Sequence, residues 1–292
     1  MSLVRKAIIP AAGYGTRMLP ATKAIPKEML PIVDKPAIQY IVEEAFNSGI
    51  EDILIIINRG KSAIEDHFDK EPILEDTLKR SNKTEYLESI EHLYKLGNIQ
   101  YVRQPEQKGL GNAVSYAKSF VGNEPFVVLY GDDVIMSDYP VTKQLIDAYE
   151  KYHKTCLGIK EVSDELIVKY SSMKVNHIHD NLFNVTDMIE KPSLCERFSN
   201  YSILGRVLLT PDIFPIIDNL TPGAGGEIQL TDAIRTVAKT EGCIGVDFIG
   251  KRYDMGNKLE MLKAIVETAL VHDELKEGFK EYLLNIVKTL DN

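Results

Sequence analysis

The chain has 292 residues, of which 44% are hydrophobic, and a formal net charge of −9. This acidic balance argues against sequence-independent binding of nucleic acid, which depends on many Lys and Arg contacts to phosphates. It has no apolar run near the ~20 residues of a membrane span, and its start lacks the apolar region of a signal peptide. Its cysteines, Cys156, Cys195 and Cys243, follow no metal-binding spacing and fit reduced thiols. We therefore expect a cytoplasmic protein that binds neither nucleic acid nor membrane.

The first predicted element is a short buried strand, Ala7–Ile9, which opens into a loop punctuated by glycines. Gly13 and Gly15 let the backbone N–H groups turn toward an anion, because no Cβ stands in the way. Basic residues follow at intervals: Arg17, Lys23 and Lys27. The pattern predicts a cradle for the phosphates of a nucleoside triphosphate, and a tight turn with solvated basic residues is the alternative.

The next elements predict a parallel sheet. Apolar residues at helical spacing from Ile38 to Phe46 indicate a helix, and 53–57 indicates a buried strand. Residues 61–96 read as polar helices with breaks at Pro72 and at 81–83. A strand, helix and strand in this order give parallel pairing, and the ligands of such sheets bind beyond the carboxyl ends of the strands.

A third strand, 99–103, leads into a second glycine loop that begins at Gln104 and contains Gly109. A glutamine amide carries both a donor and an acceptor, so Gln104 is able to pair with the imide edge of uracil or thymine. A turn residue on the surface is an equally good interpretation of Gln104 from the residues alone.

A fourth strand, 126–130, ends in Gly131, Asp132 and Asp133. Carboxylates at the carboxyl end of a buried strand suit Mg²⁺, which prefers a few carboxylates together with phosphate oxygens and water. The alternative is a pair of aspartates that stabilise a turn.

The second half of the chain predicts further strands and helices. In chain order these are a helix at 141–152, a strand at 155–160, a hairpin of 173–178 and 183–189, a strand at 202–209, a helix around 233–237, a strand at 244–249 and C-terminal helices from Lys258. Apolar stripes on the C-terminal helices pack either on the core or on another subunit.

Several motifs together resemble the signature of the bacterial glucose 1-phosphate uridylyltransferases, also called UDP-glucose pyrophosphorylases. They are Gly-x-Gly-Thr-Arg, Leu-Pro-x-Thr-Lys and Pro-Lys-Glu-Met-Leu-Pro near the N-terminus, Glu-Lys-Pro at 190–192 and GAGGEIQLTD at 223–232. The resemblance spans residues 6–270. It implies an enzyme that joins UTP and α-D-glucose 1-phosphate into UDP-glucose and pyrophosphate with Mg²⁺. The apolar stripes of the C-terminal helices predict a subunit contact, and we expect a homodimer or homotetramer.

The resemblance also implies an α/β fold: one Rossmann-like domain, 1–292, with a mixed, mostly parallel sheet flanked by helices, a small sugar-binding β-hairpin insertion and C-terminal helices. Within it, residues 1–135 form the nucleotide-binding half, 136–256 the sugar-phosphate-binding half, and 257–292 the C-terminal helices, with an oligomer contact.

The resemblance assigns roles to individual residues. Those that bind the nucleotide are Ala11, Ala12, Gly13, Gly15, Gln104 and Gly109. The catalytic group is Arg17, Lys27, Asp132 and Lys191. Those that bind the sugar phosphate are Glu190, Lys191 and Gly205, and those that bind the metal are Asp132 and Asp254.

Two positions depart from the family pattern. Asn112 stands where the family commonly has His, which alters local hydrogen bonding, and Ser171 follows Tyr170 where Gly is usual, which weakens the inference about the sugar. Two other functions stay open on the sequence: thymidylyl transfer to glucose 1-phosphate, and a non-catalytic regulatory protein that senses a nucleotide sugar.

Overall fold

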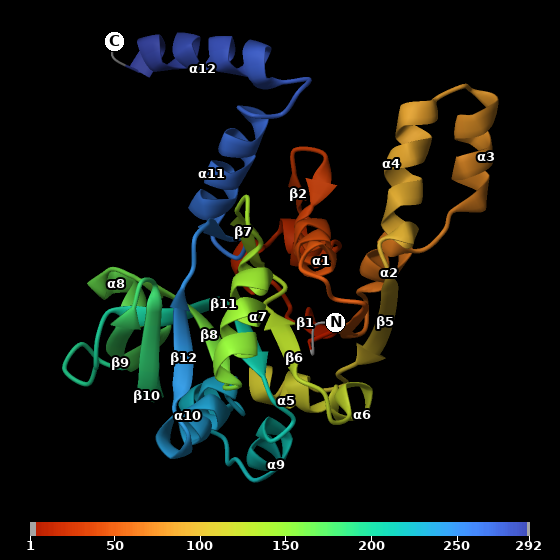
Figure 1. The fold of residues 1–292 in the computed structure, drawn as a ribbon. Helices are drawn as coiled ribbons and strands as arrows, with labels where there is room; N and C mark the ends of the chain where they lie inside the picture. Colours follow the sequence, from red (N-terminus) through yellow and green to blue (C-terminus); the bar gives the residue numbers. More distant parts are fainter. Residues whose placement is uncertain (1–3, 291–292) are drawn as a thin grey trace.

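The computed structural model describes residues 4–290, which are built around a central sheet (Figure 1). Within those residues this sheet has nine strands in the order β5-β4-β1-β6-β11-β8-β12-β10-β9. Their bounds, in that order, are Asn98–Arg103, Asp52–Ile57, Lys6–Pro10, Phe126–Leu129, Tyr201–Leu209, Cys156–Glu161, Cys243–Asp247, Leu182–Glu190 and Ser171–His179. β11 and β10 run against the other strands, because each pairs antiparallel with both of its neighbours. The mixed, mostly parallel α/β sheet predicted from the sequence is confirmed.

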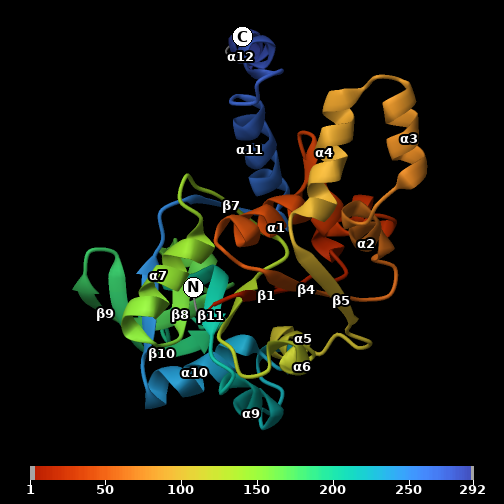
Figure 2. The ribbon, with the colours of Figure 1, turned by 45° about the vertical axis from the view of Figure 1, so that its right-hand side comes forward.

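Helices cover both faces of the sheet, because its central strands are apolar on both sides. In β1, Ala7 and Ile9 belong to the core beneath α1 (Ala37–Asn47) and α7 (Val141–Tyr152). Ile8 points the other way, into the core beneath α5 (Leu110–Ser115), α9 (Ile213–Asp218) and α10 (Leu230–Thr240). Figure 2 shows β1 between α1 and α5. The result is a three-layer domain.

Two helical arms project from the same side of this domain (Figures 1 and 2). After α2 (Ser62–Phe68), α3 (Pro72–Arg80) and α4 (Thr84–Lys95) form one arm, with the breaks where the sequence predicts them. α11 (Lys258–Ala269) and α12 (Lys276–Leu290) form the other. Among residues 4–290, no helix is both long and apolar enough to cross a bilayer.

The remaining elements are short. They are the 3₁₀ turns η1 (Thr16–Met18), η2 (Ala21–Lys23), η3 (Lys27–Met29) and η4 (Ala224–Gly226), the strands β2 (Pro31–Ile32) and β3 (Lys35–Pro36), and the helices α6 (Lys118–Val121) and α8 (Asp164–Ile167).

The predicted hairpin of β9 and β10 forms one edge of the central sheet, because β10 pairs with β12. The second half of the chain differs from the sequence prediction near its last strand. The strand predicted over 244–249 ends at Asp247, and a further strand, β13 (Lys251–Asp254), follows it. β13 pairs antiparallel with β7 (Asp133–Met136) outside the central sheet, with Asp254 opposite Asp133.

Candidate active site

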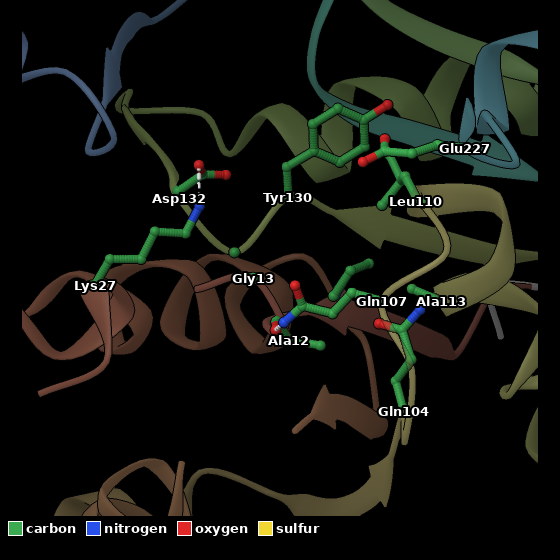
Figure 3. Close-up of a pocket in the computed structure, with 13 residues that line it drawn as sticks. Ala12, Gly13, Lys27, Gln104, Gln107, Leu110, Ala113, Tyr130, Asp132 and Glu227 are labelled. Atoms are coloured by element: carbon green, nitrogen blue, oxygen red, sulfur yellow. Dashed lines mark hydrogen bonds and ion pairs between the residues drawn. The ribbon is translucent and has the colours of Figure 1, made fainter. Parts of the chain in front are cut away.

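The loops that follow β1, β5 and β6 enclose a cavity of about 270 Å³ (Figure 3). Its walls hold Ala12 and Gly13 after β1, Gln104 and Gly109 after β5, and Asp132 after β6, together with Lys27. Further lining comes from Pro10, Gln107, Leu110, Ala113, Tyr130, Gly131 and Glu227. The structure therefore brings six of the residues assigned from the sequence into one cavity at the carboxyl ends of three strands.

Two cations and two carboxylates form a cluster where Lys27 and Asp132 line the cavity, and Arg17 and Asp254 complete it from outside the lining. Lys27 Nζ lies 2.5 Å from Asp132 Oδ2. Arg17 Nη2 lies 3.8 Å from the same oxygen, and Arg17 Nη1 lies 3.5 Å from Asp254 Oδ2. Arg17 comes here because Gly15, in the left-handed region at φ 64°, turns the chain into η1. The arrangement places positive charge and metal-type ligands side by side.

Asp254 reaches this cluster by a route that the sequence does not reveal. It ends β13, which β7 holds by antiparallel pairing, and the N–H of Met255 donates to the Asp132 carbonyl at 2.8 Å. The N–H of Gly256 donates to Asp254 Oδ1 at 2.8 Å and fixes the carboxylate. The two aspartates are neighbours because a small separate sheet joins them, and not because both end strands of the central sheet.

The two adjacent aspartates have different electrostatic surroundings. Burial disfavours the charge of Asp132, but Lys27 and Arg17 outweigh it and hold the pKa of this carboxyl below its usual range. Burial raises the pKa of Asp133 to about 6, although Arg252 Nη2 lies 2.5 Å from its Oδ1. Asp132 is thus kept ionised beside the cavity, whereas Asp133 forms an ion pair with Arg252.

The donor set fits a divalent ion that is shared with a ligand. Within residues 4–290, no group of three or more His, Cys, Asp or Glu is placed to hold a metal. Asp132 and Asp254, however, both lie against Arg17. Mg²⁺ is commonly held by one or two carboxylates and completed by water and substrate phosphates. Such an ion would be bound by the protein and a phosphorylated ligand together.

The opposite wall of the cavity carries amide side chains. Gln104 is only 3% exposed, and its Nε2 donates to Asn112 Oδ1 at 2.8 Å. Gln107 donates through its amide to the Ala12 carbonyl, and Asn58 Nδ2 does so at 2.6 Å. These contacts leave a wall of fixed donors and acceptors, suited to the edge of a base.

Three residues assigned to the nucleotide shape the backbone around the cavity. Ala11 is buried in the core and its N–H donates to the Ile56 carbonyl at 2.8 Å, so it does not line the cavity. Gly15 also lies outside the lining, where it forms the turn before Arg17. Gly109 has φ 101°, and a Cβ there would lie 2.6 Å from the Ile228 carbonyl oxygen. Glycine is therefore required where this loop packs on residues 227–228.

The residues assigned to the sugar phosphate lie outside the cavity lining. Glu190 ends β10, and burial raises the pKa of its carboxyl. Lys191 is exposed and has φ 46°, a strained backbone for a non-glycine residue of the kind found at ligand sites. Gly205 is buried with φ 76°, and a Cβ there would lie 2.8 Å from Asp133 Cβ. Gly205 thus supports the aspartates through close packing.

Three polar side chains that line the cavity have no role predicted from the sequence: Gln107, Tyr130 and Glu227. Tyr130 comes directly before Gly131 and Asp132, at the carboxyl end of β6. Because ligands bind beyond such strand ends, this position in the sequence could have predicted its place in the cavity. Burial raises the pKa of its phenol, with a further contribution from Glu190. Glu227 belongs to the GAGGEIQLTD segment, which entered the sequence prediction only as part of the family signature. Figure 3 shows Tyr130 beside Glu227.

Comparison with known proteins identifies the family of the chain. Residues 6–269 match the nucleotidyl transferase family, and the chain belongs to it. Enzymes of this family generally use divalent metal ions. The chain is 50% identical over 289 residues to UTP–glucose-1-phosphate uridylyltransferase 2 of Staphylococcus saprophyticus, covering 98% of this chain and 100% of that protein. It is 48% identical to UTP–glucose-1-phosphate uridylyltransferase YngB of Bacillus subtilis, covering 98% and 96% of the two chains.

Solved structures give the same picture. A UTP-bound UGPase from Acinetobacter baumannii is 36% identical with a TM-score of 0.89, over 96% of this chain and 99% of that one. A UDP-glucose pyrophosphorylase complexed with UDP-glucose is 43% identical with a TM-score of 0.81, over 90% and 97%.

Proposed function

We propose that this protein transfers uridylyl from UTP to α-D-glucose 1-phosphate, giving UDP-glucose and pyrophosphate. The observation that carries the proposal is one cavity with amide side chains on one wall and Lys27 and Asp132 at its other end. Outside the lining, Arg17 joins Asp132 to Asp254. Such a cavity suits a base and its phosphates. Near-complete coverage at 48–50% identity by relatives named for this activity supports the choice of UTP and glucose 1-phosphate.

The reaction requires no general base. A phosphate monoester has a second pKa of about 6, so the attacking oxygen of glucose 1-phosphate is largely deprotonated at neutral pH. It forms a bond to the α-phosphorus of UTP, and the bond from that phosphorus to the bridging oxygen breaks as pyrophosphate leaves. The barrier is the repulsion between two polyanions, so the protein must align them and neutralise their charge.

The cations divide this task between the two substrates. Lys27, held beside Asp132, and Arg17, whose side chain is 63% exposed and pairs with Asp132 and Asp254, would bind the triphosphate. Lys191 would bind the sugar phosphate and Glu190 the sugar hydroxyls. Asp132 and Asp254 would hold Mg²⁺, which when bound neutralises phosphate charge and favours the leaving of pyrophosphate.

The protein is further proposed to be cytoplasmic and homo-oligomeric. Its cysteines are free, as a reducing compartment keeps them. Large apolar side chains are exposed on the arm of α11 and α12: Leu259 (60%) and Leu262 (59%) of α11 and Tyr282 (59%) of α12. Apolar side chains gathered on a projecting arm are typical of an interface, and a second copy of the chain would cover them in a homodimer or homotetramer.

Pyrophosphate release tests the proposal. The enzyme is incubated with Mg²⁺, glucose 1-phosphate and UTP, dTTP, CTP or ATP in turn, and galactose 1-phosphate replaces glucose 1-phosphate in a second series. We expect the highest kcat/KM with UTP and glucose 1-phosphate. A preference for dTTP would instead identify a thymidylyltransferase. Binding of UDP-glucose without turnover of any pair would identify a nucleotide-sugar sensor.

A further inference from the structure

Gln104, in the wall of the cavity, forms a hydrogen bond with Asn112 behind it. Gln104 follows β5, where its N–H donates to the Ile57 carbonyl at 2.8 Å. Asn112 lies in the first turns of α5, and its Oδ1 accepts a hydrogen from Gln104 Nε2 at 2.8 Å. The N–H of Gly111 donates to the Ile228 carbonyl at 2.9 Å and anchors that helix turn. Both partners are therefore attached to fixed backbone.

This bond decides which atom Gln104 offers to the cavity. A primary amide carries a donor on one side and an acceptor on the other, and a half-turn exchanges them. With Nε2 engaged by Asn112, the oxygen is left facing the opposite side. Figure 3 shows the Gln104 oxygen on the side of Ala12 and Gln107 and the nitrogen on the side of Ala113. The cavity thus meets a hydrogen-bond acceptor.

An acceptor at this place distinguishes uracil from cytosine. Uracil carries a hydrogen on N3 and donates it, whereas cytosine has a lone pair on N3 and accepts. An oxygen that faces N3 pairs with uracil, and it leaves two acceptors opposed with cytosine. Sites built to hydrogen-bond one partner reject the analogue that leaves a buried polar group unpaired.

We propose that Asn112 is a positioning residue that fixes the Gln104 amide with its oxygen toward the cavity and so sets the preference for uracil over cytosine. The proposal rests on the proposed function only in placing a pyrimidine nucleotide in this cavity. Thymine has the same N3–H edge as uracil, so Asn112 has no part in separating UTP from dTTP.

Three variants separate positioning from simple support of the fold. Asn112→Leu keeps the approximate size and removes the acceptor, which frees the Gln104 amide to turn. Asn112→Asp keeps an oxygen in the same place and is unable to donate, so it holds the amide in the proposed orientation. Ser115→Ala is the control, because Ser115 lies on the same helix and its hydroxyl contacts the Asn112 carbonyl and not the Gln104 amide.

Two measurements are made on each protein after its thermal unfolding is recorded. One is kcat/KM for UTP, CTP and dTTP with glucose 1-phosphate, and the other is the affinity for UTP and CTP by titration calorimetry. In Asn112→Leu the UTP-to-CTP ratio should fall about fivefold or more, the effect of one neutral hydrogen bond, while the UTP-to-dTTP ratio stays constant. Asn112→Asp and Ser115→Ala should keep the wild-type UTP-to-CTP ratio.

An unchanged UTP-to-CTP ratio in Asn112→Leu, with both nucleotides weakened equally, would make Asn112 a structural residue and overturn the proposal. So would a loss of the uracil preference in Asn112→Asp, because it would mean that Asn112 donates to Gln104. Wild-type protein that binds UTP and turns over no substrate would defeat the proposed function alone, and the binding ratios would still test Asn112. If Asn112→Leu does not fold, Asn112→Asp carries the test.

Discussion

A buried ion pair beside the cavity gives the sharpest prediction about stability. Glu28 is 0% exposed and Lys61 is 5% exposed, and Lys61 Nζ donates to Glu28 Oε2 at 2.6 Å. Replacing Lys61 by Met keeps the length of the side chain and leaves a buried carboxylate without its partner. Breaking a buried pair in this way costs about 3–5 kcal/mol. At about 2 °C per kcal/mol for a domain of this size, the Tm should fall by about 6–10 °C.

The loss should depend on pH in a defined direction. Burial raises the pKa of Glu28, whereas Lys61 lowers it, so Lys61→Met should raise it further. A carboxyl whose folded pKa exceeds its unfolded value binds its proton more tightly when folded, and protonation therefore stabilises the fold. The deficit of Lys61→Met against wild type should be largest at neutral pH and should shrink as the pH falls toward 4.5, the ordinary value for Glu.

The assay is thermal unfolding by circular dichroism from pH 5 to 8. Lys118→Met is the matched control, because Lys118 Nζ lies 2.7 Å from Asp218 Oδ2 on the surface, where such pairs contribute about 0–1 kcal/mol. Glu28→Met combined with Lys61→Met should recover most of the lost stability, since no charge is left buried. Equal losses for Lys61→Met and Lys118→Met, or a deficit that does not change with pH, would refute the reasoning.

Three further predictions concern the metal, a glycine and the C-terminal arm. Asp132→Asn and Asp254→Asn should each lower turnover more than UTP affinity, and the double variant should cost little beyond the worse single one, because the two act as a unit; a wild-type rate and Mg²⁺ dependence in Asp254→Asn would remove Asp254 from the metal site. Gly205→Ala should lower the free energy of unfolding by about 1–3 kcal/mol more than Gly122→Ala does. Both glycines have positive φ, but a Cβ at Gly205 would collide with Asp133, whereas a Cβ at Gly122 meets nothing within 4 Å. Equal losses of stability in denaturant melts would contradict this. Removal of residues 276–292 should give a smaller oligomer by sedimentation velocity, and a monomeric full-length protein at micromolar concentration would contradict the interface.

The sequence by itself determined the elements and the broad arrangement of the site. Apolar periodicity located α7 at Val141–Tyr152, and short apolar runs located β1, β4 and β6, because these patterns are properties of neighbouring residues. The rule that parallel strands present their carboxyl ends at one edge brought Gly13, Gln104 and Asp132 together in advance.

Only the tertiary structure decided the contacts that tune this site. Three contacts join residues that no sequence pattern links. They are the pairing of β13 with β7, the Gln104–Asn112 hydrogen bond and the buried Glu28–Lys61 ion pair. Glu28 in particular looks like an ordinary surface charge, since glutamate is almost never fully buried unless it is paired. Gly205 likewise reads as one glycine in a strand until Asp133 is placed against it. Such contacts depend on how distant segments pack, which local patterns do not encode.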